Sequence, residues 1–330
     1  YAAARPEWYF MFLFQWLKYF PAGMEVVGAI LIPTVVVATI AAMPLLGRWQ
    51  LGRSFNLALT FGVVGAIGLL TWQAYSQDGT DEDFLAAQSG AAAAASRAVE
   101  LAEGPEGIPA PGALALLRTD PYTQGPRLFA ENCASCHTYE GHDGLGRLPE
   151  DEPSASDLHR FGSRDWLEGL LDPDRVATTE YFGGTEHRSG RMARYVQRGI
   201  AHFDHEEQLQ LASVIKALSA EAGLGYQSGA EEADQEEIAE GRALIQTEEM
   251  RCTECHEFQG VVEEQRGPSL TGYGSRPWML RMVTDPTDPE LYGDNNDRMP
   301  SFGVEGILSE QQIGLIVDWI REDWYRRPDS

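Results

Sequence analysis

The sequence predicts an all-α protein that has a membrane part, a linker and two copies of one small helical domain. Three observations lead to this prediction. Two uncharged apolar stretches lie within the first 75 residues, and an alanine-rich segment that favours a helix follows them. The last two thirds of the chain contain one block of residues twice, and each copy ends in an apolar stretch of helical length. We predict a membrane part at 1–75, a linker at 76–115 and domains at 116–225 and 226–330.

The two apolar stretches, Val26 to Leu46 and Phe55 to Tyr75, are each long enough to cross a bilayer as a helix, at about 1.5 Å per residue. The short connection between them carries Arg48 and Arg53. Basic residues in short loops mark the cytoplasmic side of a membrane. The segment before the first span and everything after the second are therefore predicted to lie on the outer side.

Two helical segments flank the spans. The stretch from Arg5 to Phe20 is dense in aromatic residues and too short for another span, so we predict an amphipathic helix in the outer membrane interface. After the spans, Ala86 to Leu101 is predicted to be helical because it is rich in alanine. Gly104 to Gly112 contains three prolines and is predicted to be extended.

The net charge of −25 is unevenly distributed. Residues 1 to 75 contain four basic and two acidic side chains, so the negative excess lies entirely after Tyr75. A strongly acidic exterior repels nucleic acid. It either steers a basic partner, such as a small soluble electron carrier, or serves to keep the outer domains soluble.

The internal repeat is visible in two matching blocks. The first reads Phe161-Gly-Ser-Arg-Asp-Trp166 and is followed by Asp-Pro, and the second reads Tyr273-Gly-Ser-Arg-Pro-Trp278 and is also followed by Asp-Pro. The apolar helices that end the two copies are predicted at Glu207 to Leu218 and at Ser309 to Trp324.

Each copy also contains a C-x-x-C-H motif, at Cys133, Cys136 and His137 and at Cys252, Cys255 and His256. This spacing is the attachment signature of c-type haem: the two thiols form thioethers, and the adjacent histidine ligates the iron. The motifs use all four cysteines of the chain. Structural zinc pairs usually lie much closer together, and a thioredoxin-like pair would lie in a βαβ pattern, which is absent. We therefore predict two covalently bound haem c groups.

Covalent haem is added outside the cytoplasmic membrane in bacteria, so residues 133 to 256 are predicted to lie there. This agrees with the side deduced from Arg48 and Arg53. The sequence thus predicts a protein of the bacterial cytoplasmic membrane whose haem domains face the periplasm.

The sixth ligands are predicted to be methionines, which raise the potential of a c-type haem. Met192 is assigned to the first haem and Met299, in Met-Pro, to the second. The competitors in the first copy are five histidines for which other roles are expected, namely His142, His159, His187, His202 and His205. Met279 and Met282 flank a tryptophan and are expected to pack in a core.

A ligating histidine needs its second ring nitrogen held by a hydrogen bond. Gly267-Pro268 follows the second motif at a distance that suits this task. The first copy has Ala155-Ser156 at the matching place, which leaves the acceptor for His137 open.

The two copies resemble class I cytochrome c domains. The resemblance depends on the C-x-x-C-H motifs, on the Gly267 to Gly274 stretch, on Met299-Pro, and on the spacing from Gly125 to Phe129. It implies tandem domains of this class over the last two thirds of the chain. One departure is that the last helix of the first copy has Ala217 where the second has the aromatic Trp319 of the family.

The N-terminus carries a second resemblance. Pro6-Glu7-Trp8-Tyr9 is similar to the PEWY motif of cytochrome b and of subunit IV of the cytochrome bf complex, where it lines the outer quinol-oxidation site. The resemblance implies that Glu7 accepts a proton from quinol and that Tyr9 positions Glu7 or the quinol. The alternative is a simple helix start, with Pro at the first position and Glu at the positive end of the helix dipole.

These resemblances imply a fused subunit of a bacterial quinol:cytochrome c oxidoreductase, whose complex is dimeric in the family. No histidine precedes His137, so a separate cytochrome b subunit is expected to hold haem b. A Rieske iron–sulfur protein would reduce the c haems, and a soluble cytochrome c or a terminal oxidase would accept the electrons. The alternatives are a membrane-anchored dihaem cytochrome that feeds a terminal oxidase and one that serves a periplasmic dehydrogenase.

Overall fold

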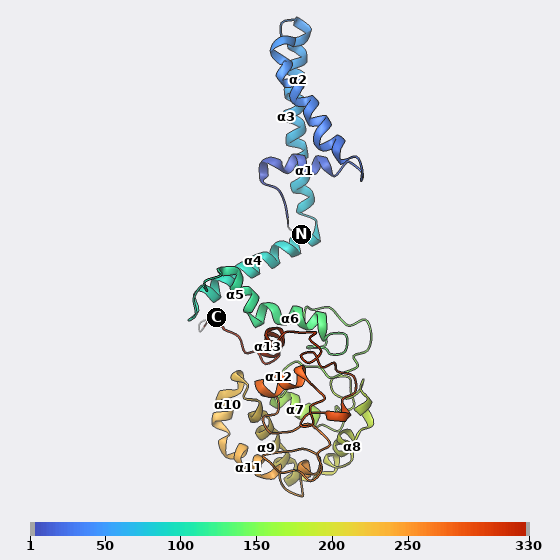
Figure 1. Ribbon diagram of the computed structural model, residues 1–330, viewed down its shortest axis with the longest axis vertical. Helices are drawn as coiled ribbons and strands as arrows, with labels where there is room; N and C mark the ends of the chain where they lie inside the picture. The colour runs from blue at the N-terminus through green and yellow to red at the C-terminus, as the bar shows by residue number, and fades with distance from the viewer. Residues whose placement is uncertain (1–3, 328–330) are drawn as a thin grey trace. The chain divides into compact units, whose positions relative to one another are not determined.

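The computed structural model describes residues 4–327 and, over these residues, contains helices and no strand, which confirms the predicted all-α class. The chain divides into two compact units between Ser96 and Arg97. The first contains the apolar helices, drawn in blue in Figure 1. The second contains both C-x-x-C-H motifs.

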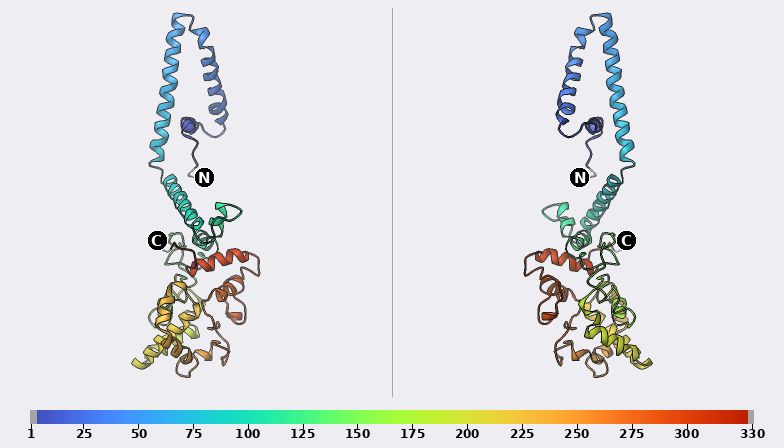
Figure 2. Two further views of the ribbon diagram at one scale, coloured as in Figure 1. Left: turned by 90° about the vertical axis from the view of Figure 1, so that its left-hand side faces the viewer. Right: turned by 90° about the vertical axis from the view of Figure 1, so that its right-hand side faces the viewer.

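The apolar part of the first unit is a helical hairpin. A π-helical turn, η2 (Val27–Leu31), continues into α2 (Ile32–Leu46), and α3 (Gln50–Asp78) returns alongside it (Figure 2). By length and composition, Val27–Leu46 and Gln50–Asp78 can each cross a membrane, as predicted. Near the turn, the side-chain amide of Asn56 donates to the carbonyl of Met43 at 2.8 Å.

The aromatic segment forms a short helix that packs on the far end of this hairpin. It consists of η1 (Trp8–Phe10) and α1 (Met11–Leu17), which packs against α3. The hydroxyl of Tyr19 donates to Gln73 at 3.0 Å, and the guanidinium of Arg5 pairs with Asp78 at 2.9 Å. The aromatic segment and the last turns of α3 therefore lie at the same end of the hairpin, opposite the turn at Gly47–Trp49.

The predicted linker is mostly helical. Helix α4 (Glu82–Ala102) spans the alanine-rich segment, as expected from its composition. The segment Gly104 to Gly112, predicted to be extended, instead forms turns before α5 (Ala113–Thr119), with hydrogen bonds from the N–H of Gly107 to the carbonyl of Gly104 and from that of Gly112 to Pro109. The end of α4 is fixed by Arg97, which is 7% exposed. Its guanidinium donates to both carboxylate oxygens of Asp120, at 2.7 and 3.0 Å, and to the backbone carbonyl of Tyr325 at 2.8 Å.

Arg97→Ala is expected to lower the free energy of unfolding of the second unit by about 3–5 kcal/mol, because it leaves a buried carboxylate without its partner. Asp120 is 3% exposed and also caps the next helix through the backbone N–H of Thr123 at 3.1 Å. Denaturant unfolding of the detergent-solubilised chain measures the loss. Arg118→Ala, at an exposed position, is the control. A loss in Arg97→Ala no larger than in this control would contradict the expectation.

The second unit is built from short capped helices around the two motifs. The helix α6 leads into the first motif and α11 into the second, and α7 and α12 follow the motifs. Side-chain caps begin several of them: Ser163 accepts from the N–H of Trp166, Ser275 accepts from that of Trp278, and Asp204 and Ser309 form capping boxes. The helices are α6 (Pro121–Asn132), α7 (Arg164–Leu170), α8 (Arg191–Arg198), α9 (His205–Ala222), α10 (Ser228–Ala233), α11 (Gln235–Leu244), α12 (Arg276–Thr284) and α13 (Glu310–Ile320).

The terminal helices of the two copies pair across the chain. Helix α6, from the first copy, packs against α13, from the second, and α11 packs against α9 (Figure 1). The close approach in the first pair needs a glycine, because a Cβ on Gly125 would collide with the side chain of Trp319. In the second pair, a Cβ on Gly241 would overlap the carbonyl of Ser213 and lie 2.9 Å from the Cβ of Ala217.

The predicted arrangement of two tandem domains at 116–225 and 226–330 is not confirmed, because the helices pair across the boundary between them. Each helix pair takes one member from each side of the predicted boundary, and the contacts join residues 97–327 into one unit. The physical reason is fit: the large ring of Trp319 stacks on Tyr139 of the first copy, with ring centroids 4.1 Å apart, and packs on Phe129 at 5.3 Å.

Candidate haem sites

The first motif is a tight continuation of α6. The N–H groups of Cys136 and His137 donate to the carbonyl of Cys133 at 3.0 and 2.9 Å, so both thiols and the imidazole come from one turn. The Nδ1 of His137 lies 2.8 Å from the carbonyl of Ser156, which leaves Nε2 as the nitrogen available to iron. Burial lowers the pKa of His137 against the opposing effect of this hydrogen bond, which favours the neutral, ligating form.

The second motif repeats this geometry on the 3-10 turn η6 (Cys252–Glu254). The N–H of His256 donates to the carbonyl of Cys252 at 3.0 Å, and its Nδ1 lies 2.8 Å from the carbonyl of Pro268. This confirms that Gly267-Pro268 holds the ring. Only glycine fits at 267, because a Cβ there would lie 2.5 Å from Cε1 of His256.

The residues present fit a covalently attached haem at each motif. All four cysteines are free thiols that are partly buried, and each pair lies beside a histidine whose Nδ1 is already engaged. Bound haem would supply the redox-active iron, and this chain would supply the thioethers, the axial ligands and the shielding from water.

The loop beneath each histidine is held by a carboxylate. Asp157 accepts hydrogen bonds from the hydroxyl of Thr138 at 2.7 Å and from the backbone N–H groups of Glu140, Gly141 and His159 at 3.1, 2.8 and 2.8 Å. In the second copy, Glu257 accepts from Ser269, Thr271 and the N–H of Gly260. These bonds fix the segments that carry the carbonyls of Ser156 and Pro268.

Asp157→Asn is expected to lower the free energy of unfolding at neutral pH by about 1–2 kcal/mol, because the amide nitrogen would face hydrogen-bond donors. Burial raises the pKa of Asp157, but its four hydrogen bonds outweigh burial and lower it overall. A carboxyl group whose pKa is lowered by folding stabilises the folded state at pH values above its unfolded-state pKa, which is near 4. This stabilisation is lost as the pH falls through the folded-state pKa. The difference between wild type and variant should therefore shrink in acid.

Unfolding curves between neutral pH and acid measure this dependence. Asp165→Asn is the matched control, because the side chain of Asp165 is 79% exposed and pairs only weakly with Arg160, at 3.6 Å. A difference between wild type and Asp157→Asn that is constant with pH would contradict the expectation.

Both predicted methionine ligands lie against the core. Met192 is in the first turn of α8, and Met299 lies in an irregular segment before α13, where its carbonyl accepts from the side-chain amide of Asn296 at 2.9 Å. The assignments of Met192 and Met299 remain predictions. Met279 is buried and Met282 partly buried in the core, in agreement with the packing role expected for them.

Three of the competing histidines contact other groups. The Nδ1 of His142 accepts from the N–H of Gly144 at 2.9 Å and thereby shapes a loop. The ring of His159 packs edge-on against Tyr139, with centroids 5.0 Å apart. The ring of His187 stacks on Tyr292, with centroids 6.1 Å apart. That these histidines have roles other than ligating iron stays a prediction.

Sequence reasoning missed the carbonyl of Ser156 as the acceptor for His137. A backbone acceptor has no side-chain signature, and the only signal was the position of Ala155-Ser156 relative to Gly267-Pro268. Sequence reasoning also missed that Trp319, in the second copy, packs against Phe129 and Tyr139 beside the first motif. The one signal was the small Ala217 at the matching position in α9, which shows that the last helices of the two copies differ.

The PEWY residues lie in the first unit, apart from the haem motifs. Glu7 directly precedes η1, and its carbonyl accepts from the N–H of Phe10 at 2.8 Å. The side chains of Trp8 and Tyr9 are 71% and 50% exposed. This leaves a row of aromatic side chains and one carboxylate exposed at this end of the hairpin.

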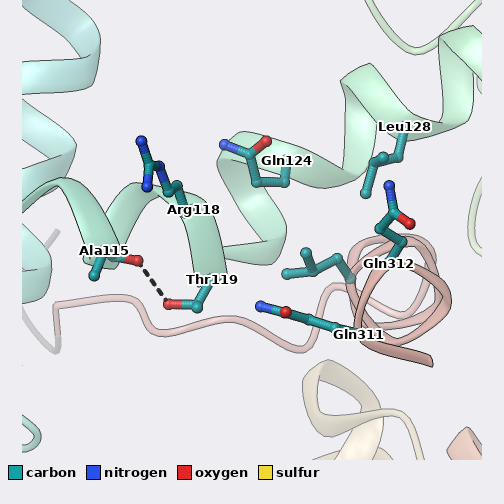
Figure 3. Close-up of a pocket in the computed structure, with 8 residues that line it drawn as sticks. Ala115, Arg118, Thr119, Gln124, Leu128, Gln311 and Gln312 are labelled. Carbon is teal, nitrogen blue, oxygen red and sulfur yellow. Dashed lines mark hydrogen bonds between the residues drawn. The ribbon is translucent and has the colours of Figure 1, made fainter. Parts of the chain in front are cut away.

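A small open pocket of about 360 Å³ lies among α5, α6 and α13 (Figure 3). Its lining combines polar side chains with Ala115, Leu128 and Leu315, and it contains none of the predicted haem ligands. It is therefore separate from the haem sites. The residues that line it are Ala115, Arg118, Thr119, Gln124, Leu128, Gln311, Gln312 and Leu315.

Comparison with known proteins identifies one part of this unit. Residues 122–219, from α6 to α9, match the family model of cytochrome c. No curated protein and no solved structure matches the chain. The match includes the first C-x-x-C-H motif, the carbonyl of Ser156 and Met192, so the chain contains a cytochrome c domain and is an electron-transfer haem protein.

Proposed function

We propose that this chain is the fused cytochrome b and dihaem cytochrome c subunit of a bacterial quinol:cytochrome c oxidoreductase. Its first unit would complete the cytochrome b core and form one wall of the quinol-oxidation site. Its second unit would carry two c haems in place of a single-haem cytochrome subunit. The observation that carries the proposal is the Pro6–Tyr9 motif. It lies near the C-terminal end of α3, and the chain continues from that end towards the haem motifs.

The contacts of the first unit support this placement. Arg5, next to the motif, pairs with Asp78, and Lys18 lies 3.5 Å from the side-chain oxygen of Gln77. The opposite end of the hairpin carries Arg48 and Arg53, which the positive-inside rule assigns to the cytoplasm. Glu7 and the haem motifs would then share the outer side, where quinol oxidation releases its protons in such a complex.

The chain's own residues have distinct tasks in the proposed reaction. Oxidation of quinol to quinone releases two electrons and two protons. Glu7 would accept one of these protons, and Tyr9 would hold Glu7 or the quinol in place. One electron would go to a Rieske iron–sulfur protein and the other to haem b on a separate cytochrome b subunit. His137 and His256 would hold the irons of the two c haems on the outward path.

The acceptor of the electrons is proposed to be a soluble cytochrome c or a terminal oxidase. The negative charge of the chain, −25 overall and concentrated after Tyr75, would attract a basic carrier. Reduction of such a carrier should therefore slow as salt is added, because exposed charges are screened.

The test is the activity of the complex isolated from detergent-solubilised membranes through a tag on this chain. Quinol:cytochrome c reductase activity that a quinol-site inhibitor abolishes, together with co-purified haem b and a Rieske protein, would support the proposal. A preparation whose c haems are reduced by dithionite but which lacks this activity would overturn it. It would favour an anchored dihaem carrier that feeds a terminal oxidase or serves a periplasmic dehydrogenase.

A further inference from the structure

Each copy of the repeat divides into two halves at a glycine. The N-terminal half contains the helix before the motif, the motif itself and the loop that holds its histidine. The C-terminal half contains the short helix after the glycine, the methionine and the long last helix. The dividing residues are Gly162 and Gly274, whose φ angles of +79° and +72° favour glycine.

The two dividing glycines lie against each other. A Cβ on Gly162 would lie 3.6 Å from the Cα of Gly274. The adjacent rings of Phe161 and Tyr273 have centroids 5.4 Å apart. Arg321, at the end of α13, donates to the carbonyls of Gly274 and Ala222 at 2.6 and 2.8 Å. The copies therefore meet where each passes from its first half to its second.

The half that contains Met299 is linked to the first motif by helix packing, while its loop is also joined to the loop of the second motif, where the N–H of Ser269 donates to the carbonyl of Glu290 at 2.8 Å. The N–H of Gly303 donates to the carbonyl of Thr284, at the end of α12, at 3.1 Å, so the methionine segment is fixed on α12. Helix α12 packs on α13, and α13 packs on α6, which leads directly to Cys133. We use the name α6–α13 lobe for the group that consists of α6, the first motif, α12, the Met299 segment and α13.

The half that contains Met192 is linked to the second motif. Tyr195, one turn after Met192 on α8, donates from its hydroxyl to the carbonyl of Met250 at 2.7 Å. Met250 lies two residues before Cys252. Helix α7 packs on α9, and α9 packs on α11, which leads to the second motif. We use the name α9–α11 lobe for the group that consists of α7, α8, α9, α11 and the second motif.

We propose that the two haem sites exchange their sixth ligands between the copies. The haem on Cys133 and Cys136 would be ligated by His137 and Met299, and the haem on Cys252 and Cys255 by His256 and Met192. The sequence alone pairs Met192 with the first haem and Met299 with the second, because it follows chain order. This inference depends on the proposed function only in that both motifs carry haem.

The test removes one haem and then each methionine in turn. In the full chain with Cys252→Ser and Cys255→Ser, only the first haem remains. Adding Met299→Leu should abolish the sulfur-to-iron(III) absorption band of that haem and lower its midpoint potential, whereas adding Met192→Leu should preserve both. Met279→Leu, at a buried methionine on α12 that is not a predicted ligand, is the matched control. Loss of the band in Met192→Leu and its retention in Met299→Leu would overturn the proposal.

A second measurement avoids the cysteine changes, in case the single-haem chain does not fold. In the reduced dihaem chain, the ligating methionine methyl groups resonate far upfield in NMR spectra and give nuclear Overhauser effects to their own haem. The haem linked to Cys133 and Cys136 should contact the methyl group that Met299→Leu removes, and contact with the Met192 methyl group would overturn the proposal. Either result leaves the quinol activity test unaffected, so this inference and the proposed function fail separately.

Discussion

Glu7→Gln is expected to lower inhibitor-sensitive quinol oxidation by the intact complex by about 100-fold or more, because glutamine cannot accept the proton that quinol releases. Both c haems should still be reduced by dithionite at the wild-type rate, since Glu7 belongs to the first unit and both haem motifs belong to the second. Turnover of detergent-solubilised complex with a soluble quinol measures the effect. The residual rate should also lose the part of its pH dependence that the carboxylate contributes.

Glu25→Gln is the matched control for this change. Glu25 is the other acidic residue before the spans, and it lies outside the Pro6–Tyr9 motif. Its carboxylate accepts from the N–H of Gly23 at 3.0 Å. Its loss should leave turnover within about twofold. Wild-type turnover with an unchanged pH profile in Glu7→Gln would remove Glu7 from the reaction and, with it, the main support for a quinol site in this chain.

The double change Cys252→Ser and Cys255→Ser is expected to halve the covalent haem content, from two haems to one per chain. Serine hydroxyls form no thioether with the haem vinyl groups, so attachment at the second motif is lost. Pyridine haemochrome absorbance per mole of purified chain measures the ratio. The mirror change, Cys133→Ser and Cys136→Ser, should give the same ratio from the other motif.

The stability of the lobe that loses its haem should fall as well, because a haem that fills the interior leaves a large apolar gap when it is absent. The two variants should therefore unfold at lower denaturant concentration than wild type. A wild-type chain that carries a single haem, or a variant at the second motif with unchanged haem content, would show that only the domain matched at residues 122–219 binds haem.

Much of the fold follows from local sequence signals. The spans are specified by uncharged apolar length, α4 by its alanine content, and the starts of α7 and α12 by Ser163 and Ser275, whose hydroxyls cap the helices. The haem motifs are also local, since five consecutive residues place two thiols and an imidazole on one turn. The carbonyl of Pro268 could be predicted because a Gly-Pro pair marks its position.

The pairing of the helices could not be predicted in the same way. Two copies of one repeat offer equivalent partners, so Gly125 could in principle face either Ala217 or Trp319. The choice depends on the volume of the facing side chains and on contacts between residues far apart in the chain, such as the stacking of Trp319 on Tyr139 at 4.1 Å. Periodicity identifies which face of a helix is apolar but does not identify which of two similar helices covers it.

The pairing of α6 with α13 fixes the order in which the protein can mature. Helix α6 is synthesised near the start of the second unit and α13 at its end, so the lobe around the first motif cannot close until α13 has been made. Contacts between such distant segments slow folding, because a long loop must be closed first. The first C-x-x-C-H motif therefore stays open while the rest of the chain is made, which leaves both of its thiols accessible for haem attachment during that time. For the same reason, a chain truncated after the first copy would leave α6 without its partner helix.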